Sequence, residues 1–216
     1  MRLNGRIDRI DKYTDGDTVW IKVIDYKSGS AEFDVGLCYE GIQMQLAAYM
    51  QEALEKEERR GHRAEPAGML LYHIKDPVIR VSEPGKAEES FRMDGLCTDD
   101  PRILAKMDIR LEEGEASCVI PVRMKDGVPT AASSVMNREQ FRLLLERNRR
   151  QMVRDAERIR KGEITARPAE YSGRSGCDYC PMKAVCGFDH RISGYEYRRI
   201  EVPKKTVVIE KLKNQA

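Results

Sequence analysis

Charged side chains near the start of the chain have the types and spacing of a metal-dependent phosphodiesterase site. Asp25 and Lys27 stand two apart in a run that alternates apolar and polar residues, so on a strand they share one face. Pairing across a turn can bring Asp8 or Asp11 beside them. Carboxylates bind a hard divalent cation that stabilises charge on a scissile phosphate, and a nearby lysine can position or activate the attacking water. The spacing alone is also compatible with an alternative to a catalytic site: a surface hairpin whose charged residues form ordinary ion pairs.

The element that must position these residues is a β-hairpin. Residues 6–13 and 18–26 alternate as half-buried strands do, and Asp15-Gly16-Asp17 between them has turn chemistry. Asp11 falls three residues after Asp8 and therefore on the opposite face of an ideal strand. Residues 28–39 are expected to form a loop.

The next predicted element is an amphipathic helix over residues 40–60, ending at Gly61. Gln45 and Tyr49 lie four apart on one face of it, so both can reach the hairpin if the helix packs across the hairpin. Core packing is an equal alternative for Tyr49. The apolar run at residues 66–74 predicts a buried strand, which residues 78–82 can extend, and strand, helix and strand together indicate a mixed α/β sheet. His73 in that run is expected to be a strand-edge residue, because no Cys or His partner stands at metal-ligand spacing.

The second half of the chain carries further local signals. Asp99 or Asp100 can cap a short helix over residues 102–108, and a hairpin is expected from residues 119–124 and 128–130 around a Lys-Asp-Gly turn. Strands are expected at residues 195–202 and 204–211.

A long helix is expected from Asn137, which forms a capping box with Gln140, to about Lys161. Its predicted buried stripe consists of Phe141, Leu144, Leu145, Met152, Ala156 and Ile159. Its many arginines favour a solvated face paired with neighbouring acids over a set of phosphate contacts.

Three cysteines near the C-terminus form a second candidate site. Cys177, Cys180 and Cys186 follow a Cys-x2-Cys-x5-Cys pattern, which without a secretory context favours metal binding over disulfides. Thiolates suit zinc or an iron–sulfur cluster, and both normally take four protein ligands, of which only three are local. The remaining cysteines are expected to be ordinary small buried residues: Cys38, Cys97 and Cys118.

Composition sets the outer bounds. The chain has 216 residues, enough for one domain with a real core. Its 38 basic and 36 acidic residues nearly cancel, so net charge gives no evidence of a nucleic-acid partner. The sequence has no apolar run of membrane-spanning length, and we expect no signal peptide, a cytoplasmic location and no membrane partner. It has no Walker phosphate loop, so any ATP-driven step is expected to belong to another domain or subunit.

Several motifs resemble those of a known family. Gly-Arg-Ile-Asp-Arg-Ile-Asp at residues 5–11, Asp-Tyr-Lys-Ser-Gly at 25–29, Gln-Leu-Ala-Ala-Tyr at 45–49 and the C-terminal cysteines resemble the RecB-like branch of the PD-(D/E)XK nuclease superfamily. Within that branch they are similar to the C-terminal nuclease domains of AddB-type subunits, which belong to bacterial helicase–nucleases that process double-strand breaks. The resemblance implies a restriction-endonuclease-like fold: a mixed central sheet flanked by helices, forming one domain over residues 1–216 with an iron–sulfur cysteine loop at 172–190.

The resemblance also implies residue roles. Asp8 and Asp25 would ligate Mg²⁺ or Mn²⁺, with the Tyr26 backbone carbonyl as a further ligand, and Lys27 would orient or activate water. Gln45 and Tyr49 would support the site or the DNA. The substrate would be a DNA strand delivered single-stranded by a helicase, and the partner an AddA-like helicase/nuclease subunit.

For the cysteines, the resemblance implies a [4Fe–4S] cluster. Cys177, Cys180 and Cys186 match three ligands of the family's cluster, and the fourth lies upstream of the catalytic strand. That fourth cysteine is absent from this sequence, so the cluster is expected to be incomplete here and the chain to be a fragment of a larger protein.

Two alternatives stay open. One is a stand-alone Cas4-like exonuclease. The residues of the first motif and a long insertion at residues 85–136 argue against it. The other is a non-catalytic domain that binds DNA or a partner protein. Intact Asp8, Asp25 and Lys27 favour an enzyme, because a decayed site would have lost one of them.

Overall fold

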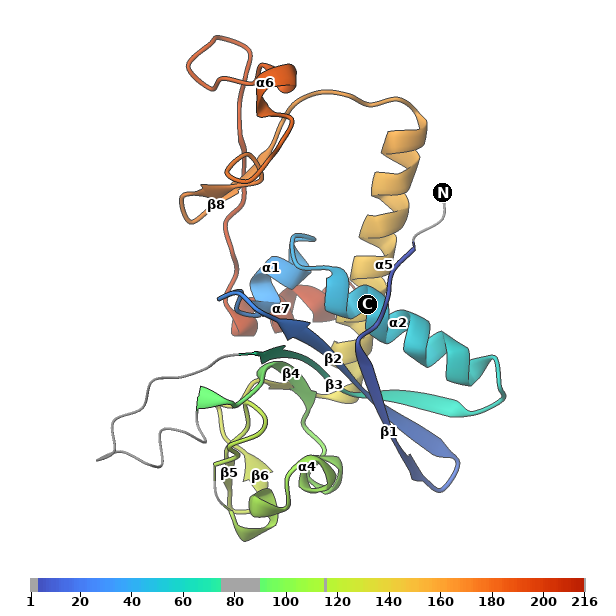
Figure 1. Cartoon of the computed structure of the whole chain (residues 1–216). Helices are drawn as coiled ribbons and strands as arrows, with labels where there is room; N and C mark the ends of the chain where they lie inside the picture. The colour runs from blue at the N-terminus through green and yellow to red at the C-terminus, as the bar shows by residue number, and fades with distance from the viewer. Residues whose placement is uncertain (1–3, 75–89, 115, 216) are drawn as a thin grey trace, which may run out of the picture.

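The architecture is a mixed five-stranded sheet with the longer helices on one face and a short helix and small irregular elements on the other (Figure 1). The computed structural model describes residues 4–74, 90–114 and 116–215. The predicted extension of the sheet at residues 78–82 lies outside them. The strand order is β1-β2-β3-β4-β7. Antiparallel pairs, β1 with β2 and β3 with β4, and parallel pairs, β2 with β3 and β4 with β7, occur in the same sheet, which confirms the mixed α/β prediction.

The predicted hairpin forms from β1 (Arg9–Asp15) and β2 (Thr18–Lys27), closed by the turn at Gly16. Its register pairs Arg9 with Ile24 and Asp15 with Thr18. β2 is an interior strand buried on both faces: Val19, Ile21 and Val23 join the core under the helices, while Ile24 joins the core on the opposite face. Burial on two sides holds this strand firmly in register, since a one-residue slip would exchange its two faces.

β2 and β3 (Arg63–His73) are parallel and therefore need a crossover, which α2 (Gln45–Glu58) provides. α2 packs on the sheet through a stripe at helical spacing: Leu46, Ala47, Met50, Ala53 and Leu54. The residues before α2 differ from expectation, because the predicted loop at 28–39 contains a short helix, α1 (Val35–Tyr39). Asp34 caps α1 by accepting hydrogen bonds from the backbone N–H groups of Gly36 and Leu37.

The segment expected to be an insertion supplies part of the central sheet. β4 (Asp94–Thr98) and β7 (Val135–Met136) extend the sheet beyond β3. Between them lie α4 (Pro101–Met107), capped by Asp100 as predicted, the 3-10 helix η1 (Ile109–Glu113) and a small hairpin of β5 (Met124–Lys125) and β6 (Val128–Pro129). Of the strand predicted at residues 119–124, only Met124 lies in a strand, as the first residue of β5.

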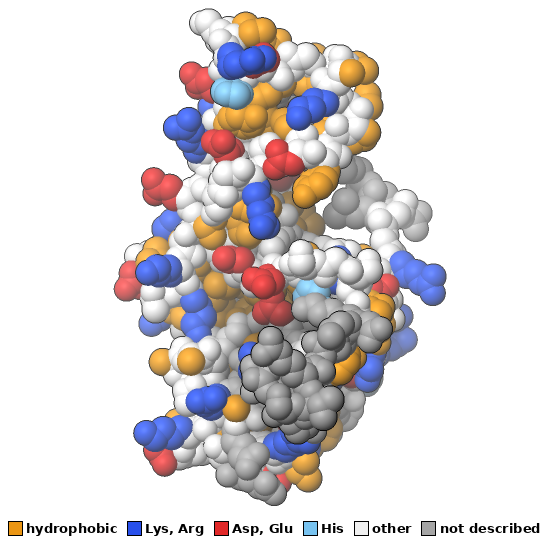
Figure 2. All heavy atoms as spheres, turned by 60° about the vertical axis from the view of Figure 1, so that its left-hand side comes forward, with side chains coloured by type: hydrophobic (Ala, Val, Ile, Leu, Met, Phe, Trp, Pro, Cys, Tyr) orange, Lys and Arg blue, Asp and Glu red, His pale blue; other side chains and the backbone are white. Residues whose placement is uncertain are grey.

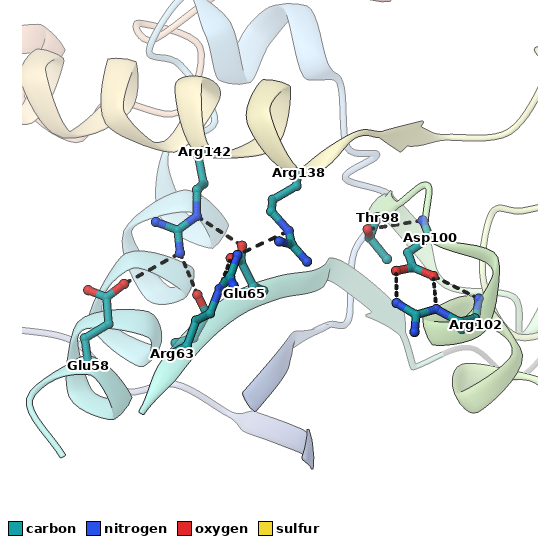
Figure 3. Close-up of polar contacts among 9 residues, drawn as sticks. Glu58, Arg63, Glu65, Thr98, Asp100, Arg102, Arg138 and Arg142 are labelled. Atoms are coloured by element: carbon teal, nitrogen blue, oxygen red, sulfur yellow. Dashed lines mark hydrogen bonds and ion pairs between the residues drawn. The ribbon is translucent and has the colours of Figure 1, made fainter. Parts of the chain in front are cut away.

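α5 (Arg138–Arg160) begins at Asn137 with the predicted capping box. Its first half buries Phe141, Leu144 and Leu145. An ionic cluster around Glu65, which is only 2% exposed, fastens α5 to β3 (Figure 3). Glu65 Oε2 accepts a hydrogen bond from Arg142 Nε at 3.0 Å. The Nε atoms of Arg63 and Arg138 lie 3.4 and 3.6 Å from Glu65 Oε1. Part of the arginine-rich face is therefore structural and not simply solvated.

The second half of α5 leaves the body of the molecule and leads into a projecting lobe, residues 161–204 (Figure 1). Not one residue from 149 to 207 is buried. The stripe predicted to run on through Met152, Ala156 and Ile159 is therefore wrong, and Ile159 is 62% exposed. The lobe contains β8 (Ala169–Tyr171), β9 (Arg174–Ser175), α6 (Lys183–Cys186) and β10 (Arg198–Arg199), and β10 is all that forms of the strand predicted at 195–202.

After the lobe the chain returns to the body beside α1. A Cβ at Gly36 would lie 2.2 Å from the Pro203 carbonyl oxygen, so only glycine permits this crossing. The chain ends in α7 (Lys205–Lys213), where the sequence had predicted a strand. Val208 and Leu212, one helical turn apart, are buried in the core shared with α1 and α5. No helix in the described part of the chain is long and apolar enough to cross a bilayer.

Candidate active site

Asp25 and Lys27 lie together at the C-terminal end of β2, on the face covered by α2. Lys27 Nζ is 2.6 Å from Asp25 Oδ2, which confirms that the two side chains share one face. Asp25 is only 3% exposed, whereas the lysine side chain is partly open to solvent. A buried carboxylate with one cation beside it is an arrangement that costs desolvation energy, and such groups gather at functional sites.

Gln45, the first residue of α2, connects this pair to the helix. Its Oε1 accepts a hydrogen bond from Lys27 Nζ at 2.9 Å, and its Nε2 donates to Asp25 Oδ1 at 3.2 Å. Nε2 also lies 3.1 Å from the Tyr49 hydroxyl, to which it donates. The side-chain amide has both a donor and an acceptor, so it can satisfy the carboxylate and the ammonium at the same time.

Asp8 enters from the residue before β1. Extending the β1–β2 register by one position places it opposite Asp25, and its Oδ2 accepts a hydrogen bond from the Tyr26 backbone N–H at 2.9 Å. Asp8 is an exposed residue, so it lies at the solvent-facing rim of the site. The Tyr26 side chain points to the opposite face, where it packs edge-on against Tyr72.

Asp11 lies outside the site, as its spacing predicted. It pairs with Lys22 at 3.0 Å and with Arg9 at 2.7 Å. Partial burial alone would raise the pKa of Asp11, but the two cations together hold that pKa below its usual value. Asp11 and its two cations belong to the same hairpin as Asp25, so a substitution of Asp11 is a matched control for a substitution of Asp25.

The arrangement fits a hard divalent cation. Asp25 Oδ2 is buried and accepts no well-formed hydrogen bond, although the lysine nitrogen lies close to it. An unsatisfied carboxylate oxygen opposite a second carboxylate matches a cation that keeps several of its waters. Within the described ranges, no three Asp, Glu, His or Cys side chains converge to hold a metal.

Among the residues that the structure describes, the three C-terminal cysteines do not converge as a metal-ligand set. Cys177 and Cys180 are half-buried and Cys186 is exposed, all three in the lobe, and none is in a disulfide. Cys38 and Cys97 are fully buried, as predicted, and burial raises the pKa of each thiol to about 12. Cys118 is only partly buried, so that prediction was wrong for this residue.

The structure also reveals residues that the sequence reasoning missed. Gln43 clamps the loop after Lys27: its Nε2 donates to the Glu32 carbonyl and its Oε1 accepts from the Asp34 N–H, both at 2.8 Å. Asp94, in β4, accepts from the Phe33 N–H at 2.5 Å. Asp94 pairs with Leu71, which pairs with Asp25, so it lies in the same row of the sheet. Only knowledge of the strand pairing could have pointed to it.

Comparison with known proteins places this geometry in context. Residues 1–187 match the profile of the PD-(D/E)XK nuclease superfamily. An ATP-dependent helicase/deoxyribonuclease subunit of Lachnoclostridium phytofermentans is 36% identical over 227 aligned residues, covering all of this chain and 20% of that protein. The corresponding subunits of Geobacillus kaustophilus and Bacillus subtilis are 34% and 31% identical, covering 98% and 100% of this chain and 19% of each relative. The chain thus spans about a fifth of the length of these relatives.

Proposed function

Because this chain belongs to the PD-(D/E)XK nuclease superfamily, we propose that it hydrolyses phosphodiester bonds of DNA as the nuclease domain of an AddB-type helicase–nuclease. The observation that carries the proposal is the convergence of Asp8, Asp25, Lys27 and Gln45 at one end of β2. A surface hairpin with ordinary ion pairs would not bury Asp25 or anchor its lysine to a helix.

Each residue has a role that follows from its contacts. Asp8 and Asp25, with the Tyr26 carbonyl, would hold Mg²⁺ or Mn²⁺, which when bound supplies charge stabilisation at the scissile phosphate. Lys27 would orient the attacking water or bind a phosphate oxygen, since its ammonium has three donors and Asp25 and Gln45 occupy two directions. Gln45 fixes the lysine and the aspartate relative to each other, and Tyr49 supports Gln45 from the next turn of α2.

The identity of the relatives favours the helicase–nuclease setting over a stand-alone Cas4-like exonuclease. The three relatives compared above are helicase/deoxyribonuclease subunits, and their similarity covers nearly the whole chain. We therefore propose a DNA strand delivered single-stranded by a helicase as substrate, a helicase of the AddA type as partner, and double-strand break repair as the process.

We further propose that Cys177, Cys180 and Cys186 are three ligands of a [4Fe–4S] cluster whose fourth ligand lies outside this sequence. Two observations support this. The lobe has no buried residue, so it lacks a core that could hold it folded, and small units of that kind commonly depend on a metal or cross-link. Its three thiols are free and accessible, unlike those of Cys38 and Cys97.

The proposal is tested by measuring cleavage of end-labelled single-stranded DNA in Mg²⁺ and in Mn²⁺. Asp25→Asn and Lys27→Ala are each expected to lower the rate by at least about a hundredfold, because each removes a group that acts on the reacting phosphate. Asp11→Asn, in the same hairpin but on the other face, is the matched control and should stay within about twofold of the wild-type rate, since partly exposed ion pairs contribute little.

Equal cleavage by the wild type and by Lys27→Ala would contradict the proposed site. DNA binding without cleavage in either metal would favour the non-catalytic alternative. Circular dichroism and thermal melting of each variant separate loss of chemistry from loss of fold.

A further inference from the structure

The loop that follows Lys27 is fastened by a histidine that the proposed reaction does not use. His73 is the last residue of β3 and only 7% exposed. Its Nδ1 lies 2.9 Å from the carbonyl oxygen of Gly29, two residues beyond the lysine. Because a carbonyl only accepts hydrogen bonds, Nδ1 must carry the proton in this contact.

The strand register places His73 directly beside the lysine of the proposed site. Lys27 pairs with His73 in the parallel β2–β3 ladder, so the two side chains emerge on the same face. The Ile74 N–H donates to the Lys27 carbonyl at 2.9 Å. β3 therefore holds the main chain at Lys27 through its backbone and at Gly29 through the imidazole.

This double attachment matters because of the chemistry of lysine. Its ammonium sits on a flexible four-carbon stem, and Lys27 is the last residue of its strand. Beyond it, Ser28 and Gly29 have no ladder partner among the described residues, and glycine confers no stiffness. Within the described part of the chain, the imidazole contact is the first side-chain anchor after the strand ends, and Gln43 and Asp94 secure the loop from Glu32 onward.

We propose that His73 is a positioning residue that acts through Nδ1: by holding the Gly29 carbonyl it fixes the backbone of Lys27, and so keeps the ammonium against Asp25 and Gln45. The inference rests on the proposed nuclease function. It assigns no direct contact between His73 and DNA or metal.

Substitution by asparagine or by glutamine distinguishes the roles of the two imidazole nitrogens of His73. The amide nitrogen of asparagine reaches about where Nδ1 lies, whereas that of glutamine reaches about where Nε2 lies. His73→Asn is therefore expected to keep kcat within about threefold of wild type. His73→Gln and His73→Leu are expected to lower kcat about tenfold with KM for single-stranded DNA unchanged, because misplacing a catalytic group slows the chemical step more than it weakens binding.

Hydrogen–deuterium exchange provides a readout that does not depend on activity. Amide exchange in residues 28–33 should accelerate in His73→Gln and His73→Leu but not in His73→Asn. This measurement shows whether Nδ1 of His73 holds the loop, even if the wild-type chain does not cleave DNA. In that case the nuclease proposal fails, and the contact between His73 and Gly29 is tested by exchange alone.

Three results would overturn the inference. Full activity in His73→Gln with loss in His73→Asn would mean that Nε2 acts directly. Unchanged kcat in all three variants would show that the contact has no catalytic consequence. Equal falls in melting temperature and activity in all three would indicate a purely structural histidine.

Discussion

At the scale of single residues, the site depends on a neutral side chain. Gln45 contacts a carboxylate, an ammonium and a phenol at once. A carboxylate at this position could accept from Lys27 but would repel buried Asp25, and an ammonium would do the reverse. An amide therefore matches both charges without adding a third.

Replacing Gln45 with methionine should lower the cleavage rate by about tenfold or more, since two hydrogen bonds to charged groups are lost. Tyr49→Phe is the matched comparison, because it removes only the outer hydroxyl and leaves both inner contacts. We expect that variant to retain at least about a third of the activity. Single-turnover cleavage rates measure both, and a larger effect from Tyr49→Phe would assign the tyrosine a direct role.

At the scale of elements, charged pairs fasten the helices to the sheet. Near the end of α2, buried Glu57 binds Lys12 of β1 at 2.6 Å, together with Arg60 and His62. The hydrogen bond from Lys12 is the main reason that the pKa of Glu57 falls to about 2, and the contact with His62 adds to it. This contact ties the outer strand of the hairpin to the helix that carries Gln45.

The Glu57 pair predicts a specific pH dependence of stability. A carboxyl whose folded pKa is depressed stabilises the fold above its unfolded pKa of about 4.5, and this stabilisation is lost as pH falls toward the folded value of about 2. The urea midpoint should therefore drop across this window in the wild type and drop less in Glu57→Gln. An identical slope in the two proteins would show that the pair does not contribute.

The Glu65 cluster between β3 and α5 predicts a loss of stability. Arg142→Met removes the closest partner of a buried carboxylate, and we expect a cost of about 3 kcal/mol, because Arg63 and Arg138 still neutralise part of the charge. The double variant Glu65→Met/Arg142→Met should recover part of the loss, since no unpaired charge stays buried. Urea denaturation measures both, and equal stabilities for the two variants would contradict this account.

Elements with strong local signals could be predicted from the sequence, whereas those defined by distant contacts could not. The Asp-Gly turn and the Asn137 capping box specify the hairpin and the start of α5 locally. The β-branched run in α7 indicated a strand, but burial of Val208 and Leu212 against α1 and α5 makes it a helix. In the site, the shared face of Asp25 and Lys27 follows from strand alternation, while the roles of Gln43 and Asp94 depend on how separate elements meet.

At the scale of the whole molecule, a packed body carries a lobe without a core. In Figure 2 the lobe forms the upper part of the molecule and presents many apolar side chains on its surface. Tyr179 is 97% exposed, and Met182 and Val185 are exposed beside it. With so little burial, the lobe should open far more readily than the body.

Thiol labelling at neutral pH tests this division. Cys177, Cys180 and Cys186 should react within seconds to minutes without denaturant, whereas Cys38 and Cys97 should react only on unfolding, being buried thiols of pKa about 12. Iron and sulfide should protect the three lobe cysteines if they ligate a cluster. Labelling of Cys38 or Cys97 as fast as the lobe would contradict the assignment of a stable body.

The residues proposed to catalyse or to position the reaction all come from one continuous stretch of the chain, which runs from just before β1 through β2 and α2 to the end of β3. They are Asp8, Asp25, Lys27, Gln45, Tyr49 and His73. In evolutionary terms this stretch can be inherited as one unit. Gene fusion or recombination that moves residues 5–74 keeps these six residues at their mutual spacing, while Asp94 of β4, which holds the loop at Phe33, stays behind. Later segments, which build the sheet edge, α5 and the lobe, can change length or sequence without altering the spacing of the site. Divergence among such proteins can therefore concentrate in how the nuclease is attached and regulated, while its chemistry is inherited as a block.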